Sequence, residues 1–355
     1  MIDDILAKYP GVRGRPEAMA MLCAVLRDKG LLDDALLLGE AAVAAAPDSL
    51  AVDLAVRDVL AKGVPSFHRP LLLDDRRNAA YASAIARMVK PGMKVLEIGC
   101  GAGLLAMLAA RAGAEVVTCE VNPLVAAAAR EVIRRNGLAD RIRVIAKLST
   151  TLTIPEDLAE PADLVIHEVF GARLFDEGVT ESLTDARQRL LKPGAPSIPA
   201  AASLRLALVR EAGTRQRRTL ADVEGFDLSA FELLAPQRPW LNSARRDGVE
   251  ICSAPASGLG MDYDRAPPFG PATETVSLVS NGGRIDGVMQ WLAIDFGNGI
   301  LHENQPLVDG EPSSWGVPLF RFKTSIDTLP GDRIELTLRH RGTLLLVDAA
   351  KRSAA

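Results

Sequence analysis

The sequence predicts an α/β domain followed by an all-β domain, with a small helical extension in front. Three observations support this. Residues 16–63 show helical periodicity without strand signals, strands alternate with helices over 64–198, and apolar residues recur at every second position beyond 199. A chain of 355 residues exceeds the comfortable size of one core, so two domains and an accessory element are expected. We therefore divide the chain into 1–63, 64–198 and 199–355.

The extension, residues 1–63, is rich in alanine and leucine and is predicted to form two or three helices. Gly30, Ala35, Ala42 and Pro47 fall at offsets that resemble a 34-residue tetratricopeptide repeat, in which small residues let two helices pack closely. One such repeat cannot bury its own face. These helices are therefore expected either to pack on the next domain or to form part of a surface for a protein partner.

A glycine turn follows the first strand of the predicted α/β domain. Segment 95–103, VLEIGCGAG, is an apolar strand that runs into glycines and then into a helical stretch. Gly99, Gly101 and Gly103 permit positive φ and let backbone N–H groups approach a ligand at the helix N-terminus. The spacing is G-x-G-x-G, not the dinucleotide pattern G-x-G-x-x-G, and Glu97 precedes the first glycine. This variant suits S-adenosylmethionine better than NAD.

The second strand, Glu115–Glu120, ends in a carboxylate about 20 residues beyond the glycine turn, where a β-α-β unit places an acid against ribose hydroxyls. Two more β-branched runs, Arg141–Ala146 and Ala162–Glu168, complete a doubly wound parallel sheet. A ligand should lie at the carboxyl ends of these strands, together with the glycine turn, Glu120, Ser149 and Glu168.

The all-β domain, a barrel or a sandwich, is predicted from period-two segments separated by turns rich in glycine and proline. Its strand candidates are Ser203–Arg210, Gly287–Phe296, Trp315–Phe322 and Arg333–His340. Between them, Phe226–Leu233 is predicted to be a short helix with exposed apolar groups, which would suit an interface.

Composition limits the functions that the chain can have. A net charge of −4 gives no electrostatic case for nucleic acid, and no run of about 18 apolar residues indicates a membrane span. The four cysteines are scattered without a C-x-x-C pair or nearby histidines, so neither a disulfide framework nor a metal site is expected. The first residues lack the apolar region of a signal peptide, and we expect a cytoplasmic enzyme.

Two glutamates suggest the substrate. Glu168 ends the fourth strand and Glu177 follows nine residues later on a loop. A guanidinium is planar and matches carboxylates in bidentate fashion, so this pair could hold a cationic substrate beside a methyl donor. Two surface acids on a loop are the alternative.

These residues resemble the protein arginine methyltransferases over about 64–350. The resemblance implies a Rossmann-like class I methyltransferase domain followed by a β-barrel domain. It also implies that Glu168 and Glu177 clamp the guanidinium of an arginine in a protein or peptide. Glu177 would accept the proton that the nitrogen loses, and no metal would be needed. In segment 72–81, Arg77 follows an aspartate by three residues and would bind the cofactor carboxylate.

The resemblance also implies further roles. The cofactor set becomes Arg77, Glu97, Gly99, Gly101, Gly103, Glu120 and Ser149. Ser149 stands where many members carry an acid, as in the monomethylating (type III) branch, and Leu174–Gly178 is also closest to that branch. Gly225–Ser229 resembles the motif of a dimerisation arm, which would lie near 222–262 and make a homodimer.

One departure concerns the loop that carries Thr-His-Trp in the family. The corresponding place is Ser313-Ser314-Trp315, so the histidine is absent, while Trp315 could still form an apolar wall of the substrate pocket. His302 lies on a different predicted turn and is a poor substitute on sequence grounds. Two alternatives stay open: a class I methyltransferase with another protein or small-molecule substrate, and a catalytically weak binding module.

Overall fold

The computed structural model describes residues 2–211, 220–234, 240–241, 248–265, 267, 269–305 and 313–352. The chain forms two compact units. Unit 1 comprises Met1–Leu72, Ile85–Glu168 and Asp185–Ser197, and unit 2 comprises Leu73–Ala84, Val169–Thr184 and Ile198–Ala355. The division at residues 63 and 198 follows composition and remains a prediction. Within the described ranges, no helix has both the length and the apolar character that a membrane crossing requires.

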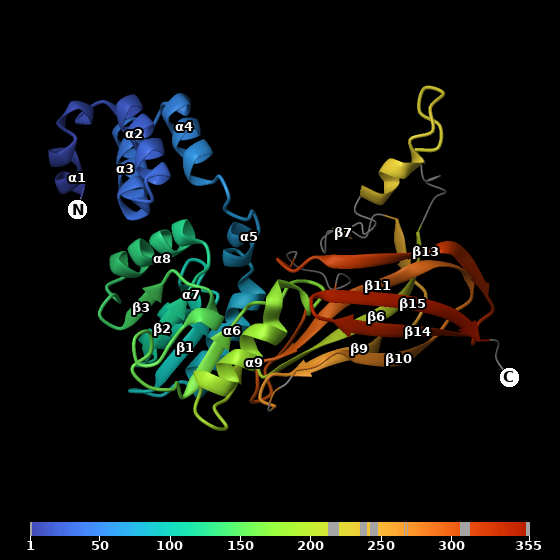
Figure 1. Cartoon of the computed structure of the whole chain (residues 1–355). Helices are drawn as coiled ribbons and strands as arrows, with labels where there is room; N and C mark the ends of the chain where they lie inside the picture. The colour runs from blue at the N-terminus through green and yellow to red at the C-terminus, as the bar shows by residue number, and fades with distance from the viewer. Residues whose placement is uncertain are drawn as a thin grey trace. The chain divides into compact units, whose positions relative to one another are not determined.

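Unit 1 contains the predicted parallel sheet (Figure 1), with strand order β3-β2-β1-β4-β5. The strands are β1 (Lys94–Ile98), β2 (Glu115–Cys119), β3 (Ile142–Ile145), β4 (Leu164–His167) and β5 (Ser197–Ile198). Helices α7 (Leu104–Arg111) and α8 (Pro123–Arg135) alternate with these strands in unit 1, whereas α6 (Asp75–Met88) and α9 (Val179–Arg189) are divided between the two units. Every residue of β4 is buried, as expected for a strand covered on both faces. Helix α8 begins sharply because the Asn122 side chain accepts the N–H groups of Leu124 and Val125.

The helical extension also belongs to unit 1. Its helices are α1 (Ile2–Lys8), α2 (Pro16–Asp28), α3 (Leu32–Ala45) and α4 (Leu50–Leu60). A 3₁₀ turn, η1 (Pro10–Val12), lies between α1 and α2, and a short helix, α5 (His68–Leu72), follows α4. Helices α2, α3 and α4 confirm the prediction of two or three helices over 16–63, whereas α1 was not predicted. Ion pairs Arg130–Asp33 and Arg135–Glu40 join α8 to α3, so the extension packs on the parallel-sheet domain (Figure 1).

Unit 2 contains the antiparallel sheets. A seven-stranded sheet has the order β7-β13-β11-β6-β8, with β9 and β12 paired at its sides, and a three-stranded sheet has the order β10-β14-β15. The strands are β6 (Ala201–Glu211), β7 (Trp240–Leu241), β8 (Val249–Ile251), β9 (Ala256–Asp262), β10 (Ala272–Val279), β11 (Gly283–Asp295), β12 (Leu301–Glu303), β13 (Val317–Thr328), β14 (Arg333–Arg341) and β15 (Leu344–Arg352). All four predicted strands are present, but β13 begins at Val317 and leaves Trp315 in the preceding loop.

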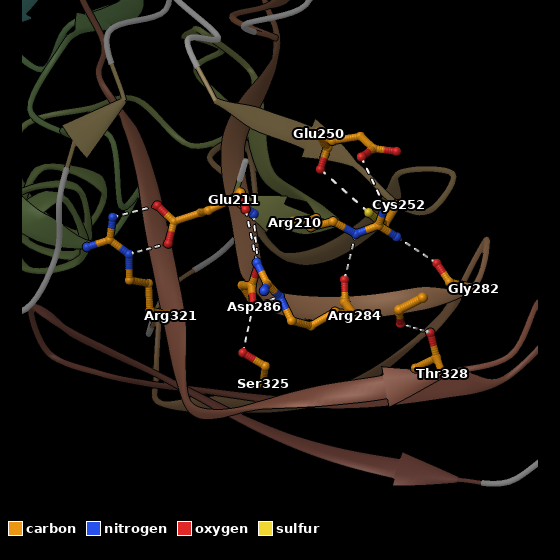
Figure 2. A network of polar contacts seen from close by, with 11 residues as sticks. Arg210, Glu211, Glu250, Cys252, Gly282, Arg284, Asp286, Arg321, Ser325 and Thr328 are labelled. Carbon is orange, nitrogen blue, oxygen red and sulfur yellow. Dashed lines mark hydrogen bonds and ion pairs between the residues drawn. The ribbon is translucent and has the colours of Figure 1, made fainter. Parts of the chain in front are cut away.

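A network of charged side chains links the long strands of unit 2 at one end (Figure 2). Arg321 of β13 binds Glu211 of β6 through two hydrogen bonds of 2.6 Å, and Asp286 of β11 accepts the backbone N–H of Glu211. Arg210 of β6 donates to the carbonyl of Arg284, which itself pairs with Asp286. A single ion pair near the surface contributes little to the free energy of unfolding. Because these pairs and hydrogen bonds connect three strands, they stabilise the strand arrangement together.

The predicted arm differs from expectation in detail. The helix expected over Phe226–Leu233 is a 3₁₀ helix, η4, at Ser229–Leu234, and Phe226 instead forms an isolated bridge with Val223. The segment projects from the strands of unit 2 (Figure 1). Its large apolar side chains are exposed, with Phe226 at 69%, Phe231 at 64% and Leu234 at 73%. Residues 235–239 and 242–247 of the predicted arm lie outside the described residues.

Candidate active site

The glycine turn of unit 1 runs between β1 and α7. Gly99, Gly101 and Gly103 have φ values of +87°, +51° and +83°, in the left-handed region that only glycine adopts without strain. A Cβ atom on Gly103 would lie 3.0 Å from the side chain of Ile133, so a larger residue here would crowd the contact between α7 and α8.

Two glutamates hold this turn in place. Glu97 is buried, and its oxygens accept hydrogen bonds from the Ala106 N–H at the start of α7 and from the Thr118 hydroxyl on β2. Glu120 follows β2, and its oxygens accept the N–H groups of Gly101 at 3.0 Å and Asn122 at 2.9 Å. Glu97 thus joins strand to helix inside the fold, while Glu120 lies at the carboxyl edge where a ligand would bind.

Two further side chains of unit 1 belong to this edge. Ser149, in the 3₁₀ turn η2 (Ser149–Thr151), is buried, and its hydroxyl has no hydrogen-bond partner among the described residues. His68 of α5 was not predicted: its Nδ1 would lie 3.7 Å from a Cβ on Gly101. Burial lowers the pKa of His68, and the nearby charge of Glu120 opposes this shift. No local motif marks His68, because only the fold brings α5 to the glycine turn.

In unit 2, the beginning of α6 is fastened to the loop before β13. Asp74 accepts the Arg77 N–H at 2.9 Å, as an N-cap residue does, and the backbone N–H and hydroxyl of Ser314 at 2.7 and 2.9 Å. The Ser313 hydroxyl donates to the same carboxylate. Arg77 is buried and its guanidinium lies over the ring of Tyr81, 4.8 Å from the ring centre.

Trp315 is buried in a row of aromatic rings. Its ring stacks on Phe170 with centres 5.7 Å apart, and Phe170 stacks on Tyr263 at 6.2 Å. Asn304 fixes the backbone by donating to the Trp315 carbonyl at 2.9 Å while it accepts the N–H of Leu292. Trp315 thus belongs to a buried aromatic row in the same unit as the loop that carries Glu177.

That loop has an unusual backbone. Leu174 and Glu177 have φ values of +66° and +65°, which non-glycine residues rarely adopt and which cost free energy. Asp176 ties the loop to itself by accepting the Gly171 N–H at 2.8 Å and pairing with Arg173. Such strain persists only where surrounding contacts determine it, which is common at functional sites.

One contact fastens the loop to β11. Gln290 is fully buried, and its Nε2 donates to the Ala172 carbonyl at 2.6 Å. Its Oε1 has no partner among the described residues. The sequence analysis missed Gln290, although a glutamine inside an apolar strand was the available signal.

Glu177 is electrostatically unusual. The residue as a whole is exposed, yet partial burial of its carboxyl group raises the pKa of Glu177 to about 7. The neighbouring charge of Asp176 adds to the rise. Glu177 can therefore exchange a proton near neutral pH.

The predicted site residues fall into two sets. The glycine turn, Glu97, Glu120 and Ser149 belong to unit 1, and Glu168 follows β4 at the end of a stretch of that unit. Arg77, Glu177 and Trp315 belong to unit 2. The described part of the chain contains no group of three or more side chains suited to hold a metal ion.

Comparisons with known proteins give this arrangement a family. Residues 81–198 match the model of the ribosomal protein L11 methyltransferase (PrmA) family. Two solved structures are similar in fold. The Trypanosoma brucei PRMT1 enzyme-prozyme heterotetrameric complex with AdoHcy has a TM-score of 0.70 at 22% identity and covers 82% of this chain and 94% of its own. Arabidopsis thaliana protein arginine methyltransferase 10 has a TM-score of 0.63 at 20% identity and covers 80% and 96%.

Sequence relatives are more specific. An arginine N(omega)-methyltransferase of Streptomyces achromogenes is 35% identical over 76% of this chain and 74% of its own length. Protein arginine N-methyltransferase 7 of Oryza sativa is 28% identical over 69% of this chain, which spans only 37% of that protein. The chain therefore belongs to the arginine N-methyltransferase family and is an enzyme that depends on S-adenosyl-L-methionine.

Proposed function

We propose that this enzyme transfers a methyl group from S-adenosylmethionine to the guanidinium of an arginine in a protein substrate and that the product is monomethylarginine. One observation carries the proposal: the strained loop after Glu168 presents Glu177 as a carboxyl group with a pKa of about 7. A group that titrates near neutrality can take a proton from a nitrogen that is being methylated.

The residues of unit 1 fit the cofactor. The buried, unpartnered hydroxyl of Ser149 suits an adenine contact, and the turn at Gly101 leaves room because it has no Cβ. Glu120 would accept hydrogen bonds from the ribose hydroxyls, while Glu97 would hold the turn from behind. Arg77, which belongs to unit 2, would pair with the methionyl carboxylate. When bound, the cofactor supplies a methyl group on a positively charged sulfur, which an in-line displacement transfers.

The acceptor side uses the two glutamates. Glu168 would keep the guanidinium charge paired, and Glu177 would orient the reacting nitrogen and receive its proton as the new N–C bond forms. Trp315 would form the apolar wall beside the planar group. Catalysis then comes from positioning and charge, and no residue of the chain forms a covalent intermediate.

A second candidate substrate has a specific motive. The relative from Streptomyces, which this chain covers over 74% of its length, is called an arginine methyltransferase without mention of protein. A small-molecule guanidine such as free arginine is therefore the alternative acceptor. A weak binding module is the third candidate, motivated by Ser314 in place of the family histidine.

We also propose a homodimer in which the arm, residues 226–233, docks on the Rossmann-like domain of a second copy. The exposed side chains of Phe226, Leu228 and Phe231 support this, because exposed apolar groups of this size favour burial in an interface. Sedimentation at micromolar concentration should detect the dimer, and a sample that stays monomeric contradicts it. The tetratricopeptide-like helices are proposed as a surface for a protein partner, and the cytoplasm as the location.

The deciding experiment combines labelled S-adenosylmethionine with three acceptors: an arginine-rich peptide, the matched lysine peptide, and free arginine. Amino-acid analysis of the products then identifies the modified group. Label in monomethylarginine of the peptide supports the proposal, whereas label only in free arginine supports the second candidate. Label in lysine, or none, contradicts the arginine acceptor. Dimethylarginine as the main product overturns only the monomethyl assignment.

A further inference from the structure

His302 lies in unit 2 beside the buried ring of Trp315. The residue belongs to β12, where it pairs with Ile294 of β11, and only 6% of its surface is exposed. Its ring is tilted against that of Trp315, with centres 5.7 Å apart. The turn expected around this histidine is a strand, and the fold brings it to the loop from which the family histidine is missing.

One atom of this ring is unsatisfied. His302 Nε2 is buried and has no hydrogen-bond partner among the described residues. A buried polar atom without a partner costs free energy, so native structures retain few of them without a use. Packing against Trp315 alone would be served as well by an apolar side chain.

Burial and two nearby arginines favour the neutral form of the His302 ring. Burial lowers its pKa first, and Arg76 and Arg77 lower it further, while Asp74 and Glu303 oppose them. Asp74 already accepts four hydrogen bonds, from Arg77, Ser313 and Ser314. A neutral imidazole can accept a hydrogen bond at the nitrogen that carries no proton.

We propose that His302 is part of the acceptor site and that its Nε2 accepts a hydrogen bond from the substrate guanidinium beside Trp315. A guanidinium carries donors only, so it complements a neutral ring nitrogen. Its flat face suits the stacked rings of Trp315 and Phe170. The histidine absent from position 314 is thus replaced from another strand. This inference rests on the proposed function.

The test compares two variants of the full-length enzyme. His302→Leu fills similar space without an acceptor, whereas His302→Gln keeps a neutral acceptor. With an arginine peptide, kcat/KM should fall about 10- to 100-fold in His302→Leu and recover to within about threefold in His302→Gln, on the scale of hydrogen bonds to charged groups. The affinity for S-adenosylhomocysteine should stay within about twofold in both. Thr328→Val, which removes a buried hydroxyl elsewhere in unit 2, is the control for stability.

The pH profile gives a second readout. Protonated His302 would repel the guanidinium, so the wild-type log kcat/KM should steepen from slope one to slope two at a pH below 6.5, the ordinary pKa of histidine. His302→Gln should keep slope one. Equal losses in both variants, full activity in His302→Leu, or a cofactor affinity that falls in step with activity would each overturn the role. If Glu177→Gln is also without effect, the proposed function itself has failed.

Discussion

The carboxylates of the two units differ in how far the protein satisfies them. In unit 1 the oxygens of Glu120 already accept two backbone N–H groups, from Gly101 and Asn122. In unit 2 the carboxyl group of Glu177 sits on a left-handed residue, desolvated and beside another acid. Glu120 is held in one position, whereas Glu177 is destabilised as an anion.

This difference matches two kinds of chemistry. A side chain that only binds a ligand gives a higher affinity when it is already fixed, because less conformational entropy is lost on binding. A group that moves a proton gains from a pKa near the working pH, which burial and a like charge provide. If Glu120 only binds and Glu177 moves a proton, substitutions of the two residues should change different steps of the reaction.

The largest effect is expected from Glu177→Gln, which keeps the volume and removes the charge. Turnover on an arginine peptide should fall about 10²-fold or more, the scale of positioned acid-base groups. Because the pKa of Glu177 is raised to about 7, the carboxyl group is protonated below that pH and accepts a proton only above it. The wild-type kcat/KM should therefore rise with pH through about 7.

The same variant should bind S-adenosylhomocysteine as the wild type does, as measured by calorimetry. If the neutral-pH limb persists in Glu177→Gln, another group titrates there, and the contrast with Glu120 loses its basis. A variant that keeps full activity on arginine peptides contradicts the acceptor role of Glu177.

A smaller effect is expected at the proposed cofactor residues of unit 1. Glu120→Ala should weaken S-adenosylmethionine binding by about 1.5–3 kcal/mol, the range for hydrogen bonds to a charged group. Glu115→Ala is the matched control, because Glu115 lies at the opposite end of β2 and is largely exposed. Calorimetric titration should separate the two. Equal affinity in both variants would remove Glu120 from the cofactor site.

The smallest effect is expected from the support of the Glu177 loop. A Cβ on Gly171 would lie 2.8 and 2.9 Å from the oxygens of Asp176, so Gly171→Ala must displace the contact that ties the loop together. We expect kcat/KM to fall several-fold with little change in cofactor affinity. Gly270→Ala, which meets no atom within 4 Å, serves as the control. If Gly171→Ala instead lowers the affinity for the cofactor, the loop that carries Glu177 also affects cofactor binding, and the two functions are not independent.

Much of unit 1 was predictable because its signals are local. The glycine turn, the acid about 20 residues later and the β-branched runs lie close together in the chain, and backbone sterics and periodicity determine their structure. Where the signal was weaker, the prediction was less accurate: η4 is a short 3₁₀ helix, and the strands β5, β7, β8, β9, β10, β12 and β15 were not predicted.

The sequence by itself determined the fold class, the family and the residues proposed to hold the cofactor. Only the tertiary structure decided that Ser314 binds Asp74 across 240 positions of the chain, that Gln290 fastens the loop of Glu177 from 118 positions away, and that His302 lies against Trp315. The physical reason is that alternating apolar residues predict which face of a strand is buried but not which distant segment covers that face. The segment that covers a given face is determined by long-range strand pairing and by the hydrogen bonds that buried polar groups require, and both form only when the whole chain packs.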